Sequence, residues 1–154
     1  MKTSRHHPAV IWACNIVLAI MIAYAAVPVG SSILIATEEW AGLSQGIGSK
    51  AVNAIPGIAF VLSLIWLSRM PTIQWRIGNG LKTAGILLLS SLPVLMVVAI
   101  VENMQPAVAG DHGAGTAAVY MVFLFGGAYG ILGLCLLIAG IVMLRRERRA
   151  AALQ

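Results

Sequence analysis

Acidic and imidazole side chains, the groups best able to hold a metal ion here, occur together in two polar segments. Glu38 and Glu39 are adjacent in the first segment, and Asp111 stands next to His112 in the second. Such oxygen and nitrogen ligands suit several divalent metals, but their spacing matches no ligand motif, and both segments are rich in glycine. An outer-loop metal-binding protein is therefore an alternative hypothesis, and we predict no metal or other cofactor.

Hydroxyl groups form a second candidate site, because four of them fall near the middle of apolar stretches: Tyr24, Ser90, Ser91 and Tyr129. Together they would suit the constriction of an oligomeric channel or facilitator for a neutral or apolar solute, which is another alternative. Hydroxyls in apolar helices commonly bond instead to their own backbone or to a neighbouring helix, at roughly 0.6 kcal/mol per interhelical bond. We expect that structural role here.

The remaining polar residues offer no catalytic set. No nucleophile stands with a base, and the sequence has neither a carboxylate pair at catalytic spacing nor a phosphate-cradling loop. Cys14 and Cys135 form no CxxC pair. Residues 9–35, 51–67, 84–101 and 117–144 include no Asp, Glu, Lys, Arg or His that could relay a proton across a membrane. We predict that the protein is not an enzyme.

Glycines in the last apolar stretch carry the strongest packing signal. They fall on one stripe of a helix: Gly126, Gly130, Gly133 and Gly140. Small residues let helix backbones approach each other, and close packing drives helix association in lipid. We expect this stripe to pack against the first or third helix of the same chain, with self-association as the alternative.

Four apolar stretches position all these residues, at about residues 9–35, 51–67, 81–101 and 117–144. The chain of 154 residues is 60% hydrophobic and 10% charged, and about 20 apolar residues suffice to cross a bilayer. The connections are outer loops 36–50 and 102–116 and an inner loop 68–80. These features predict an all-α integral membrane protein, a single membrane domain built as a four-transmembrane-helix bundle.

The N-terminal segment has a competing interpretation. Lys2, Arg5, the apolar run that follows and Ala23-Tyr24-Ala25 together resemble the three regions of a cleavable secretory signal. Apolar residues continue to Ile35 instead of giving way to polar ones after the cleavage site. We therefore expect the segment to be retained as the first span.

Basic residues indicate the orientation. Nine of the ten lie on one predicted side: Lys2, Arg5, Arg69, Arg76, Lys82, Arg145, Arg146, Arg148 and Arg149. Cytoplasmic loops carry the excess of Lys and Arg, so both termini are predicted in the cytoplasm. Arg145, Arg146, Arg148 and Arg149 end the last span and also suit anionic lipid headgroups, at about 1 kcal/mol per residue. The net charge of +5 thus indicates topology rather than nucleic-acid binding.

A small multi-pass protein with packing glycines and almost no polar residues within the membrane can bind other helices through its helix faces, but it has few groups for catalysis. We predict that it acts by helix packing with other membrane proteins, as an accessory subunit, an assembly factor or an immunity-type protector. Its expected location is a bacterial-type cytoplasmic (inner) membrane. Its expected partners are the lipid bilayer and another membrane protein or a second copy of the chain.

Overall fold

The computed structural model describes residues 8–41, 47–104 and 114–152, and these residues form four α-helices with no strand among them. The helices are α1 (Pro8–Ala41), α2 (Ile47–Ser68), α3 (Ile73–Met104) and α4 (Ala114–Ala152). The prediction of an all-α chain is confirmed.

The helices extend beyond the predicted spans. Helix α1 continues to Ala41 through Glu38 and Glu39, which were expected in a loop, and α3 begins at Ile73 instead of near residue 81. The predicted limits followed apolar composition, whereas a helix continues into polar residues once its hydrogen bonds are propagating. The predicted inner loop 68–80 therefore shrinks to a tight turn between α2 and α3.

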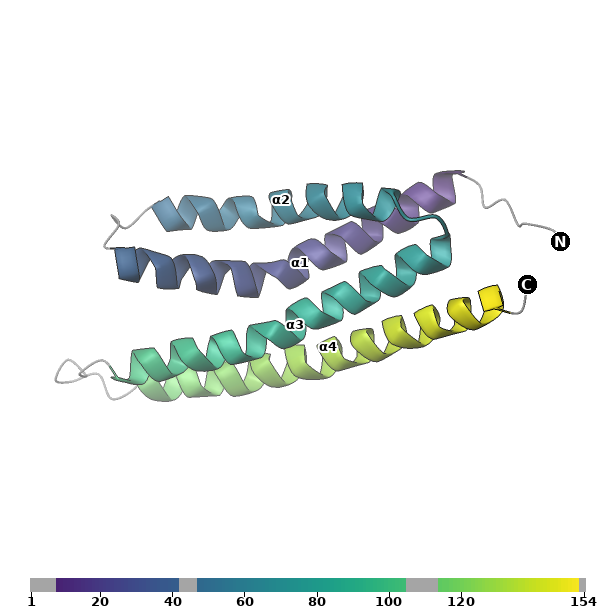
Figure 1. Cartoon of the computed structure of the whole chain (residues 1–154). Helices are drawn as coiled ribbons and strands as arrows, with labels where there is room; N and C mark the ends of the chain where they lie inside the picture. Colours follow the sequence, from purple (N-terminus) through teal and green to yellow (C-terminus); the bar gives the residue numbers. More distant parts are fainter. Residues whose placement is uncertain (1–7, 42–46, 105–113, 153–154) are drawn as a thin grey trace.

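Three helices also continue through an internal proline, namely Pro28 in α1, Pro56 in α2 and Pro93 in α3. Figure 1 shows α1 changing direction along its course. A proline inside a helix removes one backbone donor and favours such a bend.

The helices lie side by side in the order α2, α1, α3, α4 (Figure 1). Helix α1 packs between α2 and α3, and α3 packs between α1 and α4. In the described part of the chain, the backbone of α4 approaches only that of α3. The arrangement is therefore an open row, in which the two outer helices each keep a free face.

The buried core lies where α1 meets its two neighbours. It consists of Leu18, Ala19, Ile22 and Ala25 from α1, Leu67 from α2, and Ala84 and Leu88 from α3. Glycines permit close contact on both sides of α1. A Cβ atom on Gly30 would lie 2.8 Å from Ile55 Cδ1 of α2, and one on Gly80 of α3 would lie 3.0 Å from Leu18 Cδ2.

Candidate functional site

The closest helix contact is the line of glycines between α3 and α4, which we call the glycine seam (Gly78, Gly85, Gly133 and Gly140). A Cβ atom placed on Gly85 would lie 2.6 Å from both the Gly133 carbonyl oxygen and the Leu137 amide nitrogen. A Cβ atom on Gly140 would lie 2.6 Å from the Lys82 nitrogen and 2.7 Å from the Gly78 oxygen. The two backbones touch, so neither position has room for a side chain.

The register of the seam is antiparallel, because Gly78 lies opposite Gly140 and Gly85 lies opposite Gly133. Within each helix the paired glycines are seven residues apart, which is about two helical turns. Repeats of seven keep one seam facing a partner helix. Gly126 and Gly130 extend the α4 side, where a Cβ atom on either would lie 3.4 Å from a methyl group of Leu92.

Sequence reasoning missed the α3 half of this seam. It placed Gly78 in the inner loop 68–80, and it did not associate Gly85 with a packing stripe. The seven-residue spacing of Gly78 and Gly85, matched to that of Gly133 and Gly140, was the available signal. It becomes visible only when α3 is allowed to begin at Ile73.

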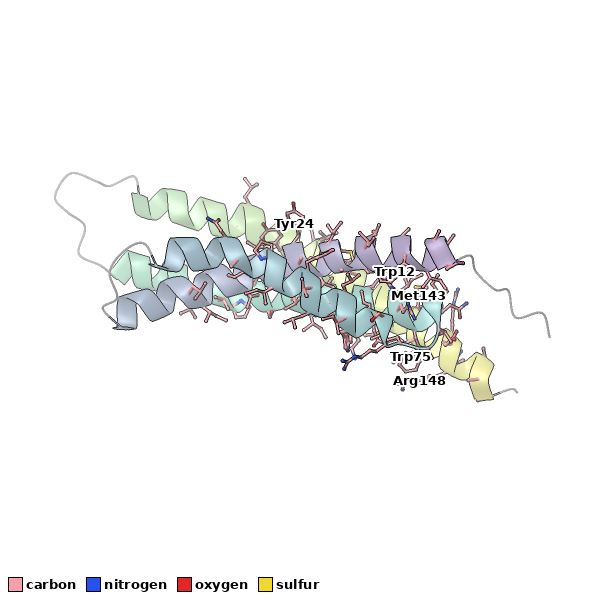
Figure 2. The ribbon with its side chains drawn as sticks, turned by 90° about the horizontal axis from the view of Figure 1, so that it is seen from above. Trp12, Tyr24, Trp75, Met143 and Arg148 are labelled. Carbon is pink, nitrogen blue, oxygen red and sulfur yellow. The ribbon has the colours of Figure 1, made fainter. Side chains whose placement is uncertain are left out.

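The four hydroxyl residues predicted at mid-membrane depth do not share an enclosed space. Tyr24 is 73% exposed and points away from the helices (Figure 2), whereas Ser91 is fully buried. The Ser90 and Ser91 hydroxyls donate hydrogen bonds to the carbonyl oxygens of Leu87 and Leu88, at 2.8 and 2.6 Å. Tyr129 is partly buried and packs against the core. The serine hydroxyls thus bond within their own helix.

Among the residues that the structure describes, Asn15 has a buried polar atom without a hydrogen-bond partner. Its side chain on α1 is 2% exposed, and its Oδ1 atom is buried without a hydrogen bond. A buried acceptor left unpaired costs about 1–3 kcal/mol. Asn15 is thus a place where this core is less stable than an apolar core.

The short turn between α2 and α3 meets the end of α4. Thr72 caps α3, because its Oγ1 accepts a hydrogen bond from the Trp75 amide at 3.2 Å. The same hydroxyl donates to Glu147 Oε1 of α4, also at 3.2 Å. The Arg148 guanidinium lies 6.0 Å from the centre of the Trp75 ring, and Figure 2 shows the two side chains together. These contacts attach α4 to the turn.

Glu147 gains a clear role from this geometry. It is the one acid within the Arg145–Arg149 run, and its carboxylate accepts the Thr72 hydroxyl beside the N-terminus of α3. Negative charge near a helix N-terminus is stabilising. A contact between residues 75 positions apart could not be read from local sequence.

Arg76 closes the other side of the same turn. Its Nε and Nη2 atoms donate to the Met70 carbonyl oxygen at 3.0 and 2.7 Å, and Nη2 also reaches the Ser68 oxygen at 3.3 Å. A cation in the first turn of α3 is unfavourably placed for that helix dipole. Its stabilising effect therefore comes from its hydrogen bonds to the carbonyl oxygens of Met70 in the turn and of Ser68, the last residue of α2.

Replacing this cap should weaken the α2–α3 hairpin. We expect Arg76→Ala to lower the free energy of unfolding by about 1–2 kcal/mol, the value of a charge-assisted hydrogen bond partly screened by solvent. Arg69→Ala is the matched control, because it removes the same charge from an exposed neighbour in the same turn. Thermal unfolding in mild detergent measures both, and equal losses would contradict the capping role.

The predicted outer metal ligands are only partly described. Asp111 and His112 lie outside the described residues, and Glu38 and Glu39 lie in the last turns of α1. Among the residues that are described, no three His, Cys, Asp or Glu side chains gather in a way that would hold a metal ion.

Two of the helices contain described segments that are long and apolar enough to cross a membrane, Pro8–Ser31 in α1 and Gly126–Ala152 in α4. A shorter apolar helix covers Val52–Ser68 in α2. Comparison with protein-family models, curated proteins and solved structures finds no match to this chain.

Proposed function

We propose that this chain is a four-span protein of a bacterial-type cytoplasmic membrane with both termini in the cytoplasm. The two membrane-length apolar segments support this proposal. Its described basic residues support it as well, because seven of them fall toward one end of the helix row, whereas Lys50 lies in the first turn of α2 at the opposite end: Arg69, Arg76, Lys82, Arg145, Arg146, Arg148 and Arg149. An excess of basic residues marks the cytoplasmic side.

Tryptophans support a membrane surface at the basic end of the row. Trp12, Trp66 and Trp75 lie within a few residues of helix ends at the basic end of the row. Trp12 and Trp66 are 55% and 42% exposed. Exposed indole rings prefer the headgroup level of a bilayer, because they combine an apolar body with a polar N–H group. Their common level is consistent with the cytoplasmic membrane surface.

Within the membrane, the proposed function is association with another membrane protein through the free outer face of α4. That face is the observation that carries the proposal. The glycine seam is occupied by α3 within the chain. The opposite side of α4 exposes large apolar side chains: Phe123, Leu124, Ile131, Leu132 and Ile138.

Small residues interrupt this apolar face and would let a partner backbone approach. A Cβ atom on Gly127 would meet nothing within 4 Å, and Ala128, Cys135 and Ala139 are exposed. Small residues on membrane helices are enriched where helices pack together. A face on which small residues flank large apolar ones therefore suits a helix of an accessory or assembly partner, or of a protein that this chain protects.

Co-purification from native membranes in mild detergent tests this function. We expect a stoichiometric membrane-protein partner, and we expect Ile131→Trp to weaken its retention about tenfold, because overpacking an interface costs about 1–3 kcal/mol. Ile58→Trp on α2 is the matched control, since Ile58 is 59% exposed and Ile131 is 71% exposed. A lone monomer, or equal loss with both variants, would count against the proposal.

A further inference from the structure

A small basic recess lies between α3 and the end of α4. It is lined by Lys82 of α3 and by Ile141, Leu144, Arg145 and Arg148 of α4, and its volume is about 140 Å³. About 10–15 Å³ of such space holds one water molecule, so the recess has room for a phosphate group.

The glycine seam brings the three cations together. Ile141, Leu144, Arg145 and Arg148 recur at the spacing of one helical face, so they line the same side of α4. The backbone of Lys82 lies close to α4 because Gly140 has no side chain. A Cβ atom on Gly140 would lie 2.6 Å from the backbone nitrogen of Lys82. Leu144 packs on Gly78 and forms part of the apolar wall.

The recess holds positive charge without a matching acid. Its lining contains no carboxylate, and within the described residues none of its three cations forms an ion pair. Glu147, the nearest acid along α4, has Oε1 engaged by the Thr72 hydroxyl. Arg148 contacts the Trp75 ring, which leaves its net charge unchanged. Like charges held close together repel one another, so an anion would stabilise this arrangement.

Phosphate is the anion chemistry that the lining favours. Arginine guanidinium groups bind phosphate oxygens with paired hydrogen bonds, and lysine adds a point charge. The apolar wall continues into exposed Val142 on α4, where an acyl chain of a lipid would lie. Basic recesses between membrane helices on the cytoplasmic side bind anionic lipid headgroups.

We propose that Lys82, Arg145 and Arg148 bind the headgroup phosphate of an anionic phospholipid in the cytoplasmic leaflet. This inference rests on the proposed membrane orientation but not on a protein partner. It assigns Lys82 to a binding site together with two of the four terminal arginines. Arg146 and Arg149, which do not line the recess, are left as general surface charge.

Binding of the purified full chain to lipid vesicles tests the proposal. We expect tighter binding to phosphatidylcholine vesicles that contain phosphatidylglycerol than to phosphatidylcholine alone. Lys82→Gln and Arg145→Gln should each weaken this preference about tenfold or more, because each removes a hydrogen bond to a charged phosphate as well as a surface charge. Arg146→Gln and Arg149→Gln are matched controls with the same loss of charge, and we expect them to weaken the preference no more than about fivefold, the effect of one basic residue near an anionic surface.

The opposite results are equally clear. Equal losses in all four variants would overturn a specific site and indicate diffuse attraction to the surface. Binding of inorganic phosphate that is lost in Arg145→Gln, together with no preference for vesicles that contain phosphatidylglycerol, would overturn the lipid assignment. Arg145 is exposed, so Arg145→Gln tests the site even if Lys82→Gln disturbs the seam. Failure of the chain to insert into any vesicle would contradict the proposed membrane function instead.

Discussion

Gly140→Leu is expected to lower the free energy of unfolding by at least about 3 kcal/mol, the upper end of the range for overpacked cores. The Cβ atom of the new side chain would lie 2.6 Å from the Lys82 nitrogen and 2.7 Å from the Gly78 oxygen. Both are backbone atoms, so no rotamer change can relieve the clash. Helices α3 and α4 would have to separate, and thermal unfolding in mild detergent should record the loss.

Gly127→Leu provides the matched control for this prediction. Gly127 lies on the same helix and undergoes the same change of residue, but a Cβ atom there would meet nothing within 4 Å. Leucine forms helices better than glycine by up to about 1 kcal/mol, so this variant should be neutral or slightly stabilised. Gly85→Leu should repeat the Gly140→Leu result from the other helix. Comparable melting temperatures for Gly127→Leu and Gly140→Leu would show that the seam does not support the fold.

The seam also shows how far sequence reasoning reaches in this chain. The α4 stripe could be found, because glycines at helical spacing in an apolar stretch indicate close packing. The α3 half of the seam could not be found, because the predicted third span began at Leu81 and left Gly78 in the inner loop. Apolar composition marks the part of a helix that suits a membrane, whereas Gly78 lies in the more polar first turns of α3. The pairing of helices needs three-dimensional information.

At the basic end of the chain, too, some features could be predicted from the sequence and others could not. The arginine run could be interpreted from sequence, because clustered basic residues after an apolar span fix orientation. The contacts that each residue of this run makes could not be predicted. Glu147 bonds Thr72, Arg148 lies over the Trp75 ring, and Arg145 joins Lys82 in the recess. Each contact joins α4 to a segment more than 60 residues earlier, and a single sequence contains no signal for such pairs.

Asn15→Asp is expected to have the second large effect on stability. Asn15 is 2% exposed, and its Oδ1 atom already lacks a hydrogen-bond partner. The substitution replaces a neutral amide with an ionised carboxylate of nearly the same size in the same enclosed position. A carboxylate within a membrane helix costs about 2.5–3.5 kcal/mol on insertion scales. The melting temperature in detergent, or the yield of membrane-inserted protein, should fall accordingly.

Two further variants distinguish the cost of burying a charge from the cost of any substitution at Asn15. Asn53→Asp makes the same chemical change at an exposed residue one helical turn from Lys50, near the end of the proposed span, where we expect a smaller loss than at Asn15 because the carboxylate can reach the membrane surface. Asn15→Leu removes the unpaired polar atom, so it should be far better tolerated than Asn15→Asp. If both aspartate variants lost the same stability, the side chain of Asn15 would be accessible to solvent. A marked loss for Asn15→Leu, with Asn15→Asp tolerated, would indicate that a bound water or other polar partner occupies the space beside Oδ1, because an unpaired amide contributes nothing that leucine would remove.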